Sequence, residues 1–378
     1  MKTGLLRLIK VITLVLAVLL TASLLQEYVL CNADHNRERV KGFYLEDNNS
    51  VDMVLIGASE VYSDFSPGRA YDRYGITGYL FATQSNSILT TKLQLQETLK
   101  RQSPKLILIE LNSALYANDK NQNKEANIRH LVDHLPLNAD KLAFIGELSP
   151  KHPEEYAFPI MKYHDMWQKI PQDMGLTGTI MDNQKRGYNY LKGIKNETNV
   201  FKARQRTMND DLKDSQAKKP LNPASEMALR DLLQYCKDQG LTNVVFTRFP
   251  HIIVRRSYDR GVRANALGDI VKEYGFDYLN FERDIKHTGV DIARDFYNLD
   301  HLNIYGQRKF TDYLLDILVK RYGLSASKQT DKQQREWREA VDYYQAYYNY
   351  SESLIKSGVR KELDEGIVSD PAFKKFLP

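Results

Sequence analysis

The stretch Val54-Leu55-Ile56-Gly57-Ala58-Ser59-Glu60 decides the fold prediction, because an apolar run leads directly into a turn of small residues and a serine. Such a run is typical of a buried strand in a parallel sheet. Ligands bind open parallel sheets at the carboxyl ends of the strands, which is where Ser59 would stand. A serine at this point is also typical of a residue that caps the next helix.

Similar apolar runs recur along the chain, separated by helical patterns. We expect strands at 51–56, 78–82, 105–111, 243–247 and 276–281. Apolar residues recur at helical spacing in Ile88, Leu95 and Leu99, in Leu229, Leu232, Leu233 and Cys236, and in Phe310, Leu314, Ile317 and Leu318. This alternation predicts an α/β fold with a central parallel sheet.

A histidine, His301, stands just before the closing helix, in the segment 298–306. In a parallel α/β topology this position lies at the same sheet edge as Ser59. A serine hydroxyl attacks esters at neutral pH only when a base takes its proton, and an imidazole is well suited to that task. The sequence therefore predicts a Ser–His pair.

The segments around this pair, GASEVYSDFSP (57–67) and DFYNLDHLNIYGQRKFTDYL (295–314), resemble the SGNH/GDSL superfamily. More narrowly, they resemble the bacterial membrane-anchored SGNH proteins related to DltD. The resemblance covers about residues 50–115 and 240–322. It implies a flavodoxin-like three-layer α/β/α fold, with Ser59 as the nucleophile and His301 as its base.

The resemblance also implies an oxyanion hole made by the Ser59 backbone NH, Ala82 and Asn112. The family pattern Asp-x-x-His would place the triad acid at position 298, where this chain has Asn298. Asn298 can orient the imidazole, and Asp295 and Asp300 are the alternative acids. A neutral amide stabilises the imidazolium less than a carboxylate does.

Further side chains are candidates for substrate binding or metal binding. Glu60 follows the serine, and Arg248 and His251 follow the strand expected at 243–247, where they would contact an anionic polymer or form a salt bridge. His130 and His134 are spaced to share a helix face, but no third ligand can be identified. We predict no metal and no cofactor, since the chain also lacks a Walker loop and a dinucleotide-binding glycine turn.

Composition limits the class of partner. The net charge is +5 and the basic residues are spread along the chain, so nucleic acid is not an expected partner. The two cysteines, Cys31 and Cys236, do not indicate a disulfide framework.

The N-terminus predicts membrane attachment. Residues 11–30 are nearly all apolar and long enough to span a bilayer, and 21–23 is a poor cleavage site. We expect residues 1–31 to be an uncleaved signal anchor that places the rest of the chain outside the cytoplasm.

Four further regions follow the anchor in this prediction. The core occupies 45–117 and 224–324, and it is interrupted at 118–223 by a helical insertion, or lid, over the carboxyl edge of the sheet. A helical tail spans 325–378, and its tyrosines either pack against the domain or contact sugars or a partner.

The expected function is that of an extracytoplasmic serine esterase or O-acyltransferase. It would act on acyl groups of a cell-surface polysaccharide or teichoic-acid-like polymer through an acyl-Ser59 intermediate. The alternative is a non-catalytic accessory protein that binds the polymer or docks on a membrane-bound O-acyltransferase.

Overall fold

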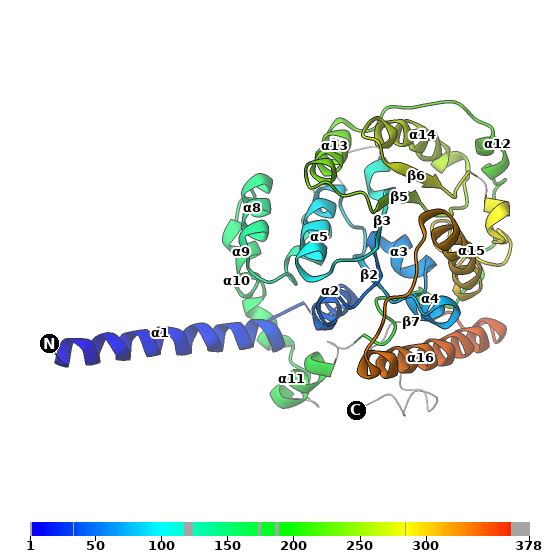
Figure 1. Ribbon diagram of the computed structural model, residues 1–378. Helices are drawn as coiled ribbons and strands as arrows, with labels where there is room; N and C mark the ends of the chain where they lie inside the picture. The colour runs from blue at the N-terminus through cyan, green and yellow to red at the C-terminus, as the bar shows by residue number, and fades with distance from the viewer. Residues whose placement is uncertain are drawn as a thin grey trace.

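The computed structural model describes residues 2–32, 34–116, 124–172, 175–185, 189–283 and 285–363. Its centre is a five-stranded sheet whose neighbouring strands are all parallel (Figure 1). The strands are β1 (Met53–Gly57), β2 (Gly78–Ala82), β3 (Leu106–Glu110), β5 (Val244–Arg248) and β6 (Asp277–Asn280). Their order is β2-β1-β3-β5-β6, so the topological switch point lies between β1 and β3.

The predicted α/β fold with a central parallel sheet is confirmed. Each expected strand is found, with both ends within two residues of the prediction. Every residue of β1, β2, β3 and β5 is buried, because helices cover both faces of the sheet. Burial on both faces explains why these strands appear in the sequence as continuous apolar runs rather than as an alternating pattern.

Two groups of helices pack on opposite faces of the sheet. The first group is α2 (His35–Leu45), α5 (Ile88–Arg101), α13 (Pro223–Asp238) and α14 (Tyr258–Glu273). The second group is α3 (Ser59–Asp64), α4 (Pro67–Tyr74), α15 (Ile304–Tyr322) and α16 (Asp331–Lys356). Each face therefore has its own apolar core.

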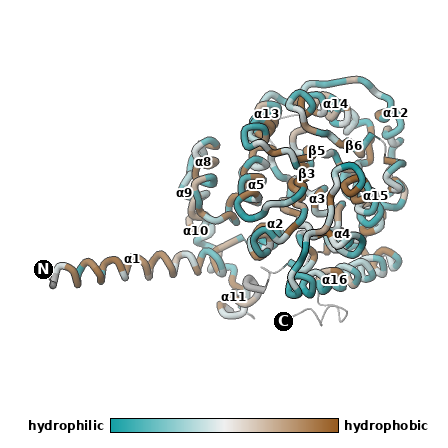
Figure 2. Tube along the Cα trace, in the orientation of Figure 1, coloured by the Kyte–Doolittle hydropathy of each residue, from teal (hydrophilic) through white to brown (hydrophobic). Residues whose placement is uncertain are grey.

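Helix α1 (Lys2–Tyr28) projects away from this body (Figure 1). Figure 2 shows that it is apolar along most of its length, and its apolar window contains no buried residues. By length and composition α1 can cross a membrane. Just beyond it, Arg37 and Lys41 form ion pairs with Glu27, which ties the end of α1 to α2.

The region expected to cover the carboxyl edge of the sheet lies mostly elsewhere. It contains α7 (Glu125–Val132), α8 (Ala139–Leu148), α9 (Pro153–Ala157), α10 (Ile160–Tyr163), η2 (His164–Lys169), α11 (Gly175–Lys185), β4 (Asn196–Glu197) and α12 (Asn209–Lys213). Helix α7 contacts α2, α8 contacts α5, and α10 and α11 contact α1. Most of the described helices of this region therefore do not form a lid. The stretch around β4 lines the pocket at the sheet edge, and single side chains of α7 and α12 contact the loops there.

The tail forms the expected helix, α16, followed by β7 (Glu362–Leu363), which pairs with β4 in an antiparallel ribbon. Trp337, Tyr343, Tyr344 and Tyr347 are buried. These aromatic side chains therefore pack α16 against the domain, as the first of the two alternatives predicted. The ribbon was not predicted, because two-residue strands leave no periodic pattern in a sequence.

Candidate active site

Ser59 follows β1 through a turn that accommodates only glycine. A Cβ on Gly57 would lie 2.8 Å from Val61 Cγ2 and 3.0 Å from the Cβ of Glu110. Real Cβ atoms do not approach that closely, so a larger residue would force the turn away from β3. Ala58 is extended and Ser59 is the first residue of α3, which places its hydroxyl at the carboxyl edge of the sheet.

His301 meets this serine from the opposite end of the chain. Its Nε2 lies 2.7 Å from Ser59 Oγ, and its Nδ1 lies 2.9 Å from Asn298 Oδ1. The predicted pair is therefore within hydrogen-bond distance, and Asn298 occupies the third position.

The tautomer of His301 follows from a backbone contact. The N–H of Asp300 donates to Asn298 Oδ1 over 2.8 Å. Because a backbone N–H can only donate, the Asn298 atom that it meets is the carbonyl oxygen. The same oxygen faces Nδ1 of His301, so Nδ1 carries the proton. Nε2 is left unprotonated and accepts from the Ser59 hydroxyl.

The loop that carries His301 is held at several points. Phe296 and Leu302 form an isolated bridge, and the N–H of Leu302 donates to Asp64 Oδ1 over 2.8 Å. The Tyr297 ring stacks on the imidazole with centroids 5.2 Å apart. Burial lowers the pKa of His301 below its usual value, so the ring is neutral at pH 7 and able to act as a base.

The two alternative acids lie elsewhere. Asp300 forms an ion pair with Arg260, and this pairing lowers the pKa of Asp300 even though burial alone would raise it. Asp295 is fully buried, accepts from the N–H of Asp291 over 2.7 Å and pairs with Lys309. Both ring nitrogens of His301 are engaged by other residues, so neither acid orients the imidazole.

Glu60, Arg248 and His251 do not line the pocket that contains Ser59. Their exposed fractions are 2%, 0% and 0%, so the expectation that they contact substrate is wrong. Residues that follow a strand end face either the solvent or the space between loop and sheet, and sequence does not distinguish the two. For Arg248 and His251, the salt-bridge alternative holds.

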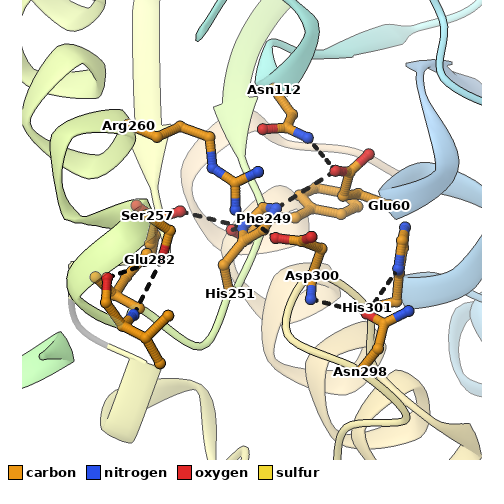
Figure 3. A network of polar contacts seen from close by, with 12 residues as sticks. Glu60, Asn112, Phe249, His251, Ser257, Arg260, Glu282, Asn298, Asp300 and His301 are labelled. Carbon is orange, nitrogen blue, oxygen red and sulfur yellow. Dashed lines mark hydrogen bonds and ion pairs between the residues drawn. The ribbon is translucent and has the colours of Figure 1, made fainter. Parts of the chain in front are cut away.

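These side chains form one buried polar network (Figure 3). Arg248 donates to Asn112 Oδ1 and pairs with Glu282, and His251 Nδ1 lies 3.2 Å from Glu282 Oε2. Asn112 Nδ2 donates to Glu60, whose carboxylate lies 3.4 Å from both His251 Nε2 and Ser59 Oγ.

The network keeps a carboxylate ionised next to the serine. Burial alone would raise the pKa of Glu60, but the hydrogen bond from His251 and the electrostatic interactions with the two nearby histidines lower it to about 2. The pKa of Glu282 is likewise about 2, because Arg248 and His251 outweigh burial. Glu60 is therefore an anion at neutral pH, close to both members of the Ser–His pair.

The structure does not bring Ala82 or Asn112 to the pocket that contains Ser59. Ala82 is fully buried in β2, its carbonyl accepts from Arg39, and the N–H of Thr83 bonds back to Gly57. The amide of Asn112 points to Glu60. Neither therefore occupies the position expected of an oxyanion donor.

The chain turns into the pocket two residues after β2, at Gln84 and Ser85. Ser85 has φ +50°, a left-handed conformation that is uncommon for a residue other than glycine. Within the described residues its N–H has no hydrogen bond, so it remains available as a backbone donor at the pocket. The run of polar and small residues after the second strand is the signal that could have identified it.

The pocket has a volume of about 210 Å³, and it is also lined by residues that were not predicted as site residues. Those residues are Tyr62, Gln84, Ser85, Lys195, Asn196, Glu197, Tyr297 and Glu362. Lys195 pairs with Glu362 over 3.1 Å, and Arg360 pairs with Glu197. Asn196, Glu197 and Glu362 come from the β4–β7 ribbon, for which the sequence gives no local signal.

The two histidines considered as metal ligands do not share a helix face. Helix α7 ends at Val132, so His134 lies beyond it. His130 Nδ1 lies 2.8 Å from the carbonyl oxygen of Gln84, and His134 is buried near Asp34. In the part of the chain that the structure describes, no group of three His, Cys, Asp or Glu side chains is arranged to hold a metal.

No protein-family model matches the chain, and a search of curated proteins found no match. The functional proposal therefore depends on the residues and the geometry of this site.

Proposed function

We propose that the chain is an extracytoplasmic serine esterase or O-acyltransferase of the SGNH/GDSL type. Its substrates would be acyl groups of a cell-surface polysaccharide or teichoic-acid-like polymer. The observation that carries the proposal is the 2.7 Å contact from Ser59 Oγ to an imidazole nitrogen left unprotonated by Asn298. The strand order and the position of both residues at one sheet edge support it.

The chemistry follows from the tautomer. As Ser59 Oγ bonds to the acyl carbonyl carbon, its proton moves to His301 Nε2. The tetrahedral intermediate then expels the alkoxide, which takes this proton and leaves as an alcohol. A water molecule or an acceptor hydroxyl next gives its proton to His301 and attacks the acyl-Ser59 ester, which releases Ser59. The N–H groups of Ser59 and Ser85 would stabilise the oxyanion.

The proposed location and partners follow from α1. A helix that can span a bilayer would hold the pocket near the extracytoplasmic surface of that membrane. There a membrane-bound O-acyltransferase could supply acyl groups. No nucleic acid, metal or cofactor enters this proposal.

A non-catalytic accessory protein is the second candidate, because Asn298 stands in the acid position and the Asn112 amide points to Glu60. A fluorophosphonate probe separates the two, since it forms a covalent bond only with an activated serine. We expect the wild-type protein to be labelled and Ser59→Ala to remain unlabelled. Unlabelled wild-type protein, shown to be folded, would favour the accessory protein.

Asn298→Asp is expected to raise kcat/KM on an aryl ester. Asn298 already fixes the correct tautomer, so the substitution adds only the charge that stabilises the imidazolium. We expect a gain of about tenfold, equal to about 1.4 kcal/mol. The new carboxylate also raises the pKa of His301, so the acid limb of the pH–rate profile should move to higher pH.

Asp300→Asn serves as the matched control for this substitution. Asp300 is paired with Arg260 and does not contact the ring, so its loss should change the rate less than the change at position 298. A severe loss in Asp300→Asn with no gain in Asn298→Asp would contradict the role assigned to Asn298.

A further inference from the structure

A second groove lies beside the pocket that contains Ser59. It has a volume of about 630 Å³ and is formed by the segment 199–205 together with Val254, Arg256 and Leu299. Lys202, Arg204 and Arg256 line it, and no acidic residue does. Phe201 and Leu299, which are partly exposed, provide apolar surface in the groove.

The three cations have no partner of opposite charge. Nearby basic side chains are paired: Arg206 with Asp211, Lys286 with Asp210 and Lys219 with Asp259. By contrast, Lys202, Arg204 and Arg256 are all exposed. Across the described ranges, none of these three forms an ion pair. Three unneutralised charges facing one groove attract an anionic ligand more strongly than scattered, paired ones do.

The groove lies next to the loop that carries His301. The Asn199 side chain donates to the carbonyl of Tyr297 over 2.9 Å, and the N–H of Phe201 donates to the carbonyl of Phe296 over 2.8 Å. Asn298 lines the pocket and the next residue, Leu299, lines the groove. The groove and the pocket are therefore lined by consecutive residues of one loop.

The pocket itself does not repel an anion. Its two acids, Glu197 and Glu362, are each paired with a basic side chain. Among the described residues that line the groove and the pocket, the Lys, Arg, Asp and Glu side chains without an ion-pair partner are therefore all basic.

We propose that this groove binds a polyanionic glycan segment, whose charged groups contact Lys202, Arg204 and Arg256 while the sugar rings lie on the apolar surface. This deepens the proposed function and rests on it, because it narrows the acceptor to a polymer that bears carboxylate or phosphate groups. Carboxylate and phosphate groups are both anions that accept hydrogen bonds from Lys and Arg. The test therefore includes one polymer of each kind.

The test measures binding rather than turnover. The full-length Ser59→Ala chain in a neutral detergent is titrated with fluorescent polygalacturonate, poly(glycerol phosphate) or neutral dextran of equal length. At least one polyanion should bind at least about tenfold more tightly than dextran, and its binding should weaken with added salt. The polyanion that binds more tightly shows whether the groove prefers carboxylate or phosphate groups.

The variant Lys202→Gln/Arg204→Gln/Arg256→Gln should weaken polyanion binding by about tenfold or more. Lys237→Gln/Lys328→Gln/Arg335→Gln removes the same charge from exposed residues outside the groove and should retain binding. The single reversal Arg204→Glu, in an irregular segment, gives a second reading if the triple variant does not fold.

Three results would overturn the proposal. They are equal binding of dextran, unchanged binding after the groove substitutions, and tighter binding of a single-stranded DNA of matched charge than of either glycan. Because no step requires catalysis, absence of esterase activity would not affect the measurement. The binding measurement can therefore contradict the proposed groove, and the activity measurement can contradict the proposed function, independently of each other.

Discussion

Ser59→Ala is expected to abolish ester cleavage and acyl transfer while leaving the fold intact. The hydroxyl provides the nucleophile, and its strongest contact is the one to His301 Nε2. No other hydroxyl replaces it at that distance from the base, so kcat should fall by at least about 10³-fold. Turnover of an aryl ester by purified protein, together with thermal unfolding, measures both effects.

The matched control is Ser66→Ala, a serine only seven positions away. The Ser66 hydroxyl caps α4 by accepting from the N–H of Arg69 over 3.1 Å. Its loss should cost about 1 kcal/mol of stability and leave turnover unchanged. The two variants thus separate activity from folding. Turnover retained by Ser59→Ala would rule out Ser59 as the nucleophile.

Of the variants proposed, Arg248→Met is expected to lower the free energy of unfolding most. The guanidinium is fully buried, where it pairs with Glu282 and donates to Asn112. Methionine is of similar length but leaves the buried Glu282 anion without its ion-pair partner Arg248, with His251 as its remaining close contact and Arg260 further away. Removing one partner of a buried ion pair costs about 3–5 kcal/mol. The urea midpoint of unfolding measures this change.

Two further variants show whether the loss arises from the stranded charge. Arg206→Met breaks an exposed pair with Asp211 and should cost about 1 kcal/mol or less. Arg248→Met/Glu282→Gln removes both charges and should recover part of the loss. If the double variant is as unstable as Arg248→Met alone, or less stable, packing rather than charge would be the cause.

The elements of the sheet could be predicted because each carries a local signal. A strand buried on both faces must be apolar along its whole length, so β1, β2, β3 and β5 are visible in the sequence. Ser59 and His301 could be placed at one edge for a related reason. In a parallel sheet, every strand ends at the same edge, and the loops that follow gather there.

The orientation of the residues beside them could not be predicted. Glu60 is adjacent to Ser59 in sequence, yet one side chain faces the pocket and the other is buried against Asn112. The direction depends on how the first turn of α3 is rotated relative to the sheet, which the residue types along the chain do not specify. Ala82 was misplaced for a similar reason, because the strand continues until the Thr83 N–H has bonded to Gly57.

The amino-acid sequence by itself determined the α/β class, the strand positions and the pairing of Ser59 with His301, because these depend on burial patterns and on sheet topology. Only the tertiary structure decided that Asn298, not Asp300, orients the imidazole, and that Arg248 and His251 hold Glu60 rather than substrate. It also brought the β4–β7 ribbon and the basic groove beside the pocket. These features arise from contacts between residues far apart in the chain, where each side chain takes the partner that compensates its burial.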